Sequence, residues 1–383
     1  MTKILVTGGA GFIGSHLSMR LLSEGHRICI LDPLSSQIHG AIPIGLNWLA
    51  DERVEFIRGC ITSRTDLQSV LKDITHIVHL AADTGTGQSM YEIARYNNVN
   101  SQGTALLFDI LANSATLKIK RFVLSSSRSI YGEGAYYCGA CGSVEARVFP
   151  SSRTSAQLAA HTWEPKCPTC SAALTMLPTL ETDQVRPASI YAATKYAQED
   201  LARIACEAMG VDYSILRFQN VYGEGQSLKN PYTGILSIFS TRVRHGLELT
   251  AFEDGLETRD FVHVEDVVES IYRSLFIDRA VNDVVNVGSG VATSVLEIAT
   301  KLTEALGAKP NVRVTGDYRI GDIRHNVADI TRLKTKLGYT PKISLDQGLT
   351  RFADWVLTQP LPEDLLGKAN EELISRKLMG TSS

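Results

Sequence analysis

The sequence has no long apolar run and no excess of one charge. No stretch approaches the roughly 20 apolar residues that span a bilayer. The start, MTKILVTGGAGFIG, interrupts its apolar run with glycines and is not typical of a signal peptide. The 38 basic and 41 acidic residues give a net charge of −3 without a block of one sign, which argues against nucleic acid or a membrane surface as partner. We therefore expect a cytoplasmic globular protein.

Cysteine is also scarce, yet four of the seven cysteines fall in one polar segment, YCGACGSVEARVFPSSRTSAQLAAHTWEPKCPTCS (137–171). They form two C-x-x-C pairs with 25 residues between them, a spacing typical of a zinc ribbon. A reducing compartment favours metal over disulfides, although disulfides and unligated thiols remain alternatives. Four thiolates leave no open position for water, which argues against a catalytic zinc. We predict a zinc-ribbon-like insertion over 136–178 with one structural zinc, bound by Cys138, Cys141, Cys167 and Cys170.

Short β-branched runs alternate with helical patterns along the rest of the chain, which predicts an α/β fold with a doubly wound, Rossmann-type parallel sheet. The candidate strands have nearly continuous apolar character, as in sheets covered on both faces: 3–7, 27–31, 74–80, 121–127 and 213–218. We expect a dinucleotide domain over 1–135 and 179–215 that the chain rejoins around 258–290. A smaller, mostly helical substrate lobe would comprise 216–257 and 291–372, and a polar tail 373–383.

A glycine-rich turn, VTGGAGFIGSHL, lies between the first expected strand and a helix. Gly8, Gly11 and Gly14 would permit a tight turn, a close approach of the backbone to a pyrophosphate, and close packing of helix on strand. Asp32 ends the next strand, about where an acid binds the adenosine ribose hydroxyls, and its charge favours NAD over NADP. The alternative is a βα turn that binds no ligand.

Two further motifs, SSSRSIYG (125–132) and YAATK (191–195), resemble those of the extended short-chain dehydrogenase/reductase family, and within it the nucleotide-sugar epimerases and dehydratases. The resemblance covers about 1–135 and 179–360. It implies that Ser127, Tyr191 and Lys195 carry the chemistry. A helix places residues i and i+4 on one face, so Lys195 would favour the Tyr191 phenolate, as would an oxidised nicotinamide. The alternative is a tyrosine packed on its own helix, with lysine as a solvated neighbour.

The same resemblance implies the ligands of cofactor and substrate. Residues expected to contact NAD are Gly8, Gly11, Phe12, Ile13, Gly14, Asp32, Leu80, Ala81, Ala82, Tyr191 and Lys195. For a dTDP- or UDP-hexose, Ser127 would contact the sugar, and LRFQNVYGEGQ, TRDFVHVEDV and GDIRHNVADITRLKTKLGYTP would supply Asn220, Arg259 and Arg324 to the diphosphate. Either arginine could instead form a surface salt bridge. Family analogy also suggests a homodimer through helices near 103–117 and 191–209.

The residues after Ser127 narrow the reaction. Related 4,6-dehydratases carry an Asp-Glu pair there, whereas this chain has Arg128 and Ser129, neither of which can act as the acid pair that eliminates water. We therefore predict a nucleotide-sugar 4-epimerase that acts through a transient 4-keto sugar, with a 4-ketoreductase as the alternative. A non-catalytic dinucleotide sensor would not need the Ser127, Tyr191 and Lys195 set. With its Cys-rich insertion, the chain is similar to a bacterial subgroup described as dTDP-L-rhamnose 4-epimerases.

Overall fold

The computed structural model describes residues 2–40, 45–142, 147–229 and 234–381. Its centre is a seven-stranded sheet in the order β12-β8-β5-β4-β1-β2-β3, and every adjacent pair is parallel. The strands are β1 (Lys3–Thr7), β2 (Arg27–Leu31), β3 (Val54–Ile57), β4 (His76–His79), β5 (Arg121–Ser127), β8 (Asp212–Phe218) and β12 (Asp283–Val287). The expected α/β fold with a parallel sheet is confirmed. Within the described ranges, no helix is long and apolar enough to cross a membrane.

Five of these strands agree with the candidate strands of the sequence, and two were missed. β3 and β12 lie at the two edges of the sheet, where each has a strand neighbour on one side only. Their sequences, VEFI and DVVNV, are short and carry exposed or half-buried residues, so neither gives a continuous apolar signal. Only the tertiary pairing with β2 and β8 identifies them as strands.

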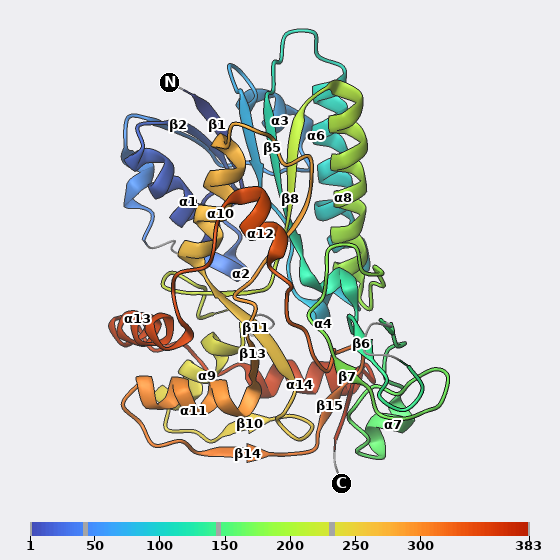
Figure 1. Cartoon of the computed structure of the whole chain (residues 1–383). Helices are drawn as coiled ribbons and strands as arrows, with labels where there is room; N and C mark the ends of the chain where they lie inside the picture. Colours follow the sequence, from blue (N-terminus) through green and yellow to red (C-terminus); the bar gives the residue numbers. More distant parts are fainter. Residues whose placement is uncertain (1, 41–44, 143–146, 230–233, 382–383) are drawn as a thin grey trace.

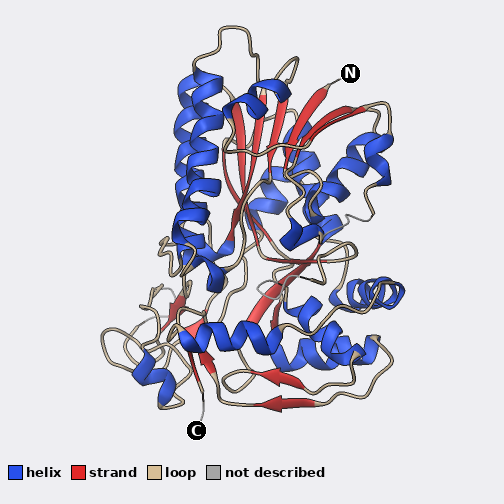
Figure 2. Ribbon diagram, turned by 180° about the vertical axis from the view of Figure 1, so that it is seen from behind, coloured by secondary structure: helices blue, strands red, loops and turns tan. Residues whose placement is uncertain are grey.

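Helices cover both faces of the sheet (Figures 1 and 2). One face packs against α3 (Arg64–Val70), α6 (Gly103–Ala112) and α8 (Ile190–Met209), and the other against α1 (Phe12–Ser23), α10 (Val264–Phe276) and α12 (Thr331–Leu337). The hydroxyl of Ser189 caps α8 by accepting a hydrogen bond from the backbone N–H of Ala192, and Gly210 ends the helix in the left-handed conformation. These local signals fix both ends of α8, whose first residue, Ile190, comes directly before Tyr191.

Short elements connect this framework. They are α2 (Ser36–His39), η1 (Asn47–Ala50), α4 (Thr86–Ser89), α5 (Ile93–Tyr96), the π-helical segment η2 (Asn97–Gln102) and η3 (Arg128–Tyr131). The carboxyl ends of β2, β4 and β5 point the same way because the strands are parallel. Asp32, Leu80 and Ser127 therefore meet at one edge of the sheet, the edge that faces the second lobe.

The second lobe lies below this edge in Figure 1 and has its own core. Its helices are α9 (Ile235–Arg244), α11 (Val295–Ala305), α13 (Leu345–Thr358) and α14 (Leu366–Ser375). Its small sheets contain β9 (Asn220–Tyr222), β11 (Thr258–His263) and β13 (Ala292–Ser294); β10 (Leu249–Ala251) and β14 (Val312–Val314); and β15 (Tyr318–Arg319) and β16 (Met379–Gly380). The sequence predicts that the chain rejoins the dinucleotide domain over 258–290. In the structure α10 packs on α1 and β12 joins the central sheet, whereas β11 belongs to the second lobe.

The expected polar tail over 373–383 requires a correction. Leu373 lies in α14 and is buried, and Met379 in β16 pairs with Arg319 and is also buried. The stretch contains four large apolar residues among polar ones, too irregular a pattern for the sequence to predict that two of them, Leu373 and Met379, are buried. Residues 382 and 383 lie outside the described part.

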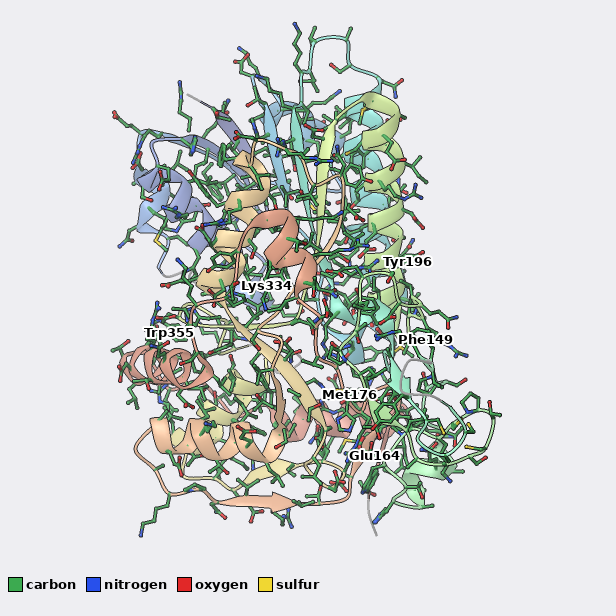
Figure 3. All side chains as sticks on the ribbon, in the orientation of Figure 1. Phe149, Glu164, Met176, Tyr196, Lys334 and Trp355 are labelled. Carbon is green, nitrogen blue, oxygen red and sulfur yellow. The ribbon has the colours of Figure 1, made fainter. Side chains whose placement is uncertain are left out.

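The cysteine-rich insertion forms a small module beside the second lobe, with β6 (Tyr136–Tyr137), α7 (Ser155–Ala159) and β7 (Thr175–Met176). Its core is a cluster of Tyr136, Cys138, Cys167 and Leu174. Figure 3 shows Glu164 and Met176 where the module meets the lobe. The described part of the module buries few large apolar residues. We therefore expect an interaction other than hydrophobic burial to stabilise the folded module.

Candidate active site

The glycine turn forms a narrow cradle between β1 and α1. Gly8 has a φ of +69°, and a Cβ there would lie 2.8 Å from the backbone N of Ala81. A Cβ on Gly14 would lie 2.5 Å from the carbonyl oxygen of Gly8. The first glycine thus permits a left-handed turn against the loop after β4, and the last permits α1 to approach the turn. The backbone is consequently free of side chains where a pyrophosphate would approach.

Asp32 follows β2 and holds this cradle in shape. Its side chain accepts hydrogen bonds from the backbone N–H of Ala10 (3.1 Å) and of Leu34 (2.8 Å), and it lies 3.8 Å from the imidazole of His39. Burial raises the pKa of the Asp32 carboxyl, while the Leu34 amide and His39 act in the opposite direction. The carboxylate therefore lies in the cavity wall with acceptor capacity for ribose hydroxyls.

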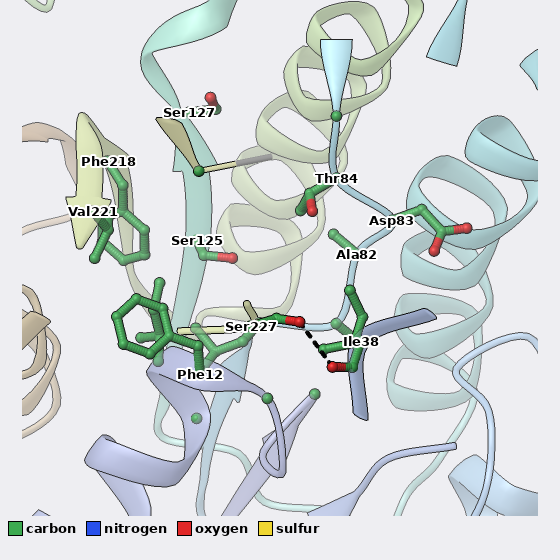
Figure 4. Close-up of a pocket in the computed structure, with 18 of the residues that line it drawn as sticks. Phe12, Ile38, Ala82, Asp83, Thr84, Ser125, Ser127, Phe218, Val221 and Ser227 are labelled. Carbon is green, nitrogen blue, oxygen red and sulfur yellow. Dashed lines mark hydrogen bonds between the residues drawn. The ribbon is translucent and has the colours of Figure 1, made fainter. Parts of the chain in front are cut away.

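A cavity of about 570 Å³ opens between the sheet edge and the second lobe. Figure 4 shows Ser125 and Ser127 of β5 on one wall, the Ala82–Thr84 loop opposite, and Ser227 hydrogen-bonded to the carbonyl of Ile38. All residues expected to contact NAD line this cavity: Gly8, Gly11, Phe12, Ile13, Gly14, Asp32, Leu80, Ala81, Ala82, Tyr191 and Lys195. Ser127 and Asn220 line it too. The cradle, the acid and the volume fit a dinucleotide together with a second ligand.

The same cavity wall brings together three expected catalytic residues: Ser127, Tyr191 and Lys195. Ser127 is the last residue of β5, and Tyr191 and Lys195 lie one turn apart on α8. Burial raises the pKa of the Tyr191 phenol, while its hydrogen bond with Ser127 and the nearby charge of Arg128 lower it. Burial lowers the pKa of Lys195 to about 7, and the charge of Glu199 opposes that shift. Tyr191 is therefore a phenol at neutral pH until additional positive charge favours its phenolate.

Neighbouring side chains hold these groups in place. The backbone N–H of Tyr191 donates to the hydroxyl of Ser89 (3.1 Å). Glu199 lies one turn beyond Lys195, and both its carboxylate oxygens accept hydrogen bonds from the buried Arg217 (2.9 and 2.7 Å). Sequence reasoning missed Glu199 as a supporting residue, although its i+4 spacing from Lys195 could have indicated it.

Neither of the two arginines expected at the diphosphate is among the residues that line the cavity. Arg259 donates to the backbone carbonyls of Thr258, Ile323 and Arg324 and to the carboxylate of Asp322 (3.0 Å). Arg324 is 1% exposed and contacts Glu164 (2.8 Å), Glu253 (3.2 Å) and both oxygens of Asp254 (2.7 and 2.8 Å). These partners already occupy the guanidinium donors, so the structure does not bring Arg324 to the cavity.

An arginine that does line the cavity is Arg128. Its Nε donates to the side-chain oxygen of Asn220 (3.0 Å). Sequence reasoning used Arg128 only to argue against dehydration and missed it as a candidate ligand. Its position directly after Ser127 was the available signal.

The four cysteines of the insertion converge in space. Every pair of their sulfurs lies within 4.8 Å, and three pairs are separated by 3.4 to 3.6 Å. Four sulfurs at about 2.3 Å from a tetrahedral ion would be about 3.8 Å apart, which agrees with these distances. Hydrogen bonds from backbone amides lower the pKa of the Cys167 thiol to about 6 and also lower that of Cys138, whereas hydrogen bonds with neighbouring thiols raise the pKa of Cys141 and Cys170. The cluster therefore has the spacing of a metal site.

Comparison with known proteins identifies the family. The model of the NAD dependent epimerase/dehydratase family matches residues 4–151 and 169–288. The chain belongs to this family. The gap in the match, 152–168, falls within the segment 136–178 that we predict to be an insertion.

Individual members of the family are similar over nearly the whole chain. A dTDP-L-rhamnose 4-epimerase of Burkholderia thailandensis is 39% identical, covering 92% of this chain and 94% of its own. A UDP-glucose 4-epimerase of Thermotoga maritima, solved with UDP-glucose, superposes with a TM-score of 0.71 at 29% identity, covering 92% of this chain and 98% of that one. A UDP-glucuronic acid 4-epimerase of Bacillus cereus, solved with UDP-glucuronic acid and NAD, superposes with a TM-score of 0.73 at 26% identity. The superposition covers 93% of this chain and 99% of that one. The chain is thus an NAD-dependent enzyme of the nucleotide-sugar epimerase group.

Proposed function

We propose that this enzyme inverts C4 of a nucleotide-linked hexose through a transient 4-keto sugar, and that its substrate is a dTDP-6-deoxyhexose such as dTDP-L-rhamnose. The convergence of Ser127, Tyr191 and Lys195 on one cavity carries the proposal. The similarity to the Burkholderia enzyme supports the choice of substrate. When bound in the glycine cradle, NAD supplies a reversible hydride acceptor for C4.

The residues of the chain handle the proton of the C4 hydroxyl. Tyr191 accepts this proton as its phenolate and later returns it, and Ser127 holds the hydroxyl by a hydrogen bond. The hydrogen bond with Ser127 and the charge of Arg128 oppose the effect of burial on the phenol pKa. Lys195, one helical turn from Tyr191, adds positive charge on the same face of α8 when it is protonated. Glu199 favours the protonated form of Lys195.

The composition of the cavity wall argues against water elimination. Asp32 and Asp83 are the only carboxylates among the described lining residues. Asp32 is occupied by backbone amides at the glycine cradle, and Asp83 forms an ion pair with Arg95 (2.8 Å). Neither lies in the position after Ser127, where a dehydratase requires its acid pair.

The test is a reaction of the purified enzyme with dTDP-L-rhamnose, UDP-glucose and UDP-glucuronate, followed by NMR of the sugar. We expect the C4 epimer of dTDP-L-rhamnose to form without added NADH and without a net change in absorbance at 340 nm. A strict requirement for one equivalent of NADH would identify a reductase instead. Accumulation of a 4-keto-6-deoxy sugar from a nucleotide hexose would identify a dehydratase.

We propose further that Cys138, Cys141, Cys167 and Cys170 bind one structural zinc ion. The four cysteine sulfurs and their spacing suit a tetrahedral ion. Because the hydrophobic core of the module is small, we expect a bound metal to stabilise its fold. The ion would have no position for water and no part in the reaction. The module contacts the second lobe through Arg153, which donates to Glu253 (2.7 Å), and through Glu164, which accepts from Arg324 (2.8 Å).

Metal analysis of the purified enzyme tests this site. We expect one zinc per chain, and its loss in a Cys138→Ser, Cys167→Ser double variant. Cys29→Ser is the matched control, because Cys29 is a buried strand cysteine outside the cluster. Full zinc content in the double variant, or no zinc in the parent enzyme, would refute the proposal.

A further inference from the structure

Arg128 is a charged group in the cavity wall whose charge is not balanced. Its Nε donates to Asn220 (3.0 Å), but among the described residues its two terminal nitrogens, Nη1 and Nη2, make no hydrogen bond and no ion pair. By contrast, the buried Arg153, Arg217 and Arg324 each contact carboxylates at 3.2 Å or less. The protein thus keeps a guanidinium with unused donors at the wall of its main cavity.

Maintaining this charge is unfavourable in the free enzyme. Burial and the neighbouring charge of Arg259 lower the pKa of Arg128 to about 9, so it remains protonated at neutral pH. The nearby acidic groups are Asp322, Asp260 and Tyr191, but Asp322 pairs with Arg259 and Asp260 accepts from Ser289 and Gly290. None of them forms an ion pair with Arg128. A desolvated cation without a counter-ion is retained where a ligand supplies the anion.

The surroundings favour a phosphate as that anion. A guanidinium binds phosphate oxygens with two parallel N–H donors, which are the two nitrogens that Arg128 leaves unused. The same cavity is lined by the first residues of α9, Ile235 and Leu236, and the N-terminal end of a helix favours negative charge. The two carboxylates among the described lining residues already have partners: Asp32 accepts from backbone amides, and Asp83 pairs with Arg95.

We propose that Arg128 binds the substrate diphosphate through Nη1 and Nη2, in the role that the family resemblance gave to Arg324. The inference rests on the proposed nucleotide-sugar substrate. Asn220 then positions the guanidinium by accepting from Nε. The protein uses Arg324 instead to join the second lobe to the cysteine-rich module through Glu164.

The test is isothermal titration of dTDP and UDP into the enzyme with its NAD bound, comparing the parent with Arg128→Met and Arg128→Lys. We expect Arg128→Met to raise Kd by at least about 10- to 100-fold, because the loss of even one of the two charge-assisted hydrogen bonds accounts for that range. Arg128→Lys retains the charge but loses the paired donors, so its Kd should lie between those of the parent and of Arg128→Met. Arg27→Met removes the same charge at an exposed site on β2 and should leave Kd unchanged.

Thermal melting distinguishes a ligand residue from a structural one. Without nucleotide, Arg128→Met should melt no lower than the parent, because a half-buried charge without an ion-pair partner among the described residues has been removed. With dTDP, its gain in melting temperature should be smaller than that of the parent. Unchanged dTDP affinity in a folded Arg128→Met enzyme would overturn the inference while leaving the proposed epimerase intact. Absence of dTDP and UDP binding by the parent would overturn both.

Discussion

Replacing Arg324 with methionine tests whether this arginine stabilises the protein or binds the substrate. Its guanidinium is buried and contacts Glu164, Glu253 and Asp254 at 2.7 to 3.2 Å. Removing one partner of a buried ionic cluster costs about 3 to 5 kcal/mol, because the remaining charges stay desolvated. Here we expect the lower end, about 3 kcal/mol, since the side chains of Glu164 and Asp254 are 37% and 31% exposed and water can reach them.

Unfolding entropy is about 2.1 cal/mol/K per residue, so in a chain of 383 residues 1 kcal/mol lowers the melting temperature by about 1.2 °C. Arg324→Met should therefore melt about 4 °C lower than the parent in calorimetry, and its Kd for dTDP should change less than threefold. Arg313→Met is the matched control: Arg313 pairs with Glu248 at 2.8 Å but is 66% exposed, so the change should lower stability by less than about 1 kcal/mol. An unchanged melting temperature with a tenfold weaker dTDP affinity would refute the structural role.

Three further predictions follow from the site and the framework. Tyr191→Phe removes the proton acceptor but keeps the ring, so turnover should fall at least about 10²-fold while the enzyme retains its NAD, as absorbance and turnover assays will show. Burial raises the pKa of Glu257 to about 7, above its unfolded value. This carboxyl therefore destabilises the fold increasingly as pH rises from about 4.5 to 7. Glu257→Gln should consequently melt higher than the parent at pH 8 and equally at pH 4, and equal melting at pH 8 would contradict this reasoning. We also expect a homodimer with α8 in its interface, where Ile204 is 56% exposed. Ile204→Lys should then sediment as a monomer, and an unchanged mass would exclude α8 from the contact.

The residues around the glycine turn and α8 show what local sequence can determine. Gly14 leaves no room for a side chain because the backbone of Gly8 and Gly9, only a few residues earlier, lies against it. The atoms that exclude a side chain at Gly8 belong to Leu80 and Ala81 after β4, so only the spacing of the turn could be predicted locally. Tyr191 and Lys195 are one helical turn apart, so their relation needs only α8 itself. Because the carboxyl ends of parallel strands meet at one edge, the sequence order alone also placed Asp32 and Ser127 beside them.

The roles of the arginines show what only the tertiary structure decided. Arg324 lies in a segment that resembles a diphosphate-binding motif, but its partners Glu164 and Glu253 come from parts of the chain 160 and 71 residues away. Whether a guanidinium is free or paired depends on such distant carboxylates, which no local pattern contains. The same holds for Arg128, because only the three-dimensional arrangement of the described residues shows that Nη1 and Nη2 have no hydrogen-bond partner among them. Motif spacing thus predicted the glycine turn and the convergence of Ser127, Tyr191 and Lys195, whereas the pairing of the charged side chains, which depends on distant parts of the chain, was decided by the fold.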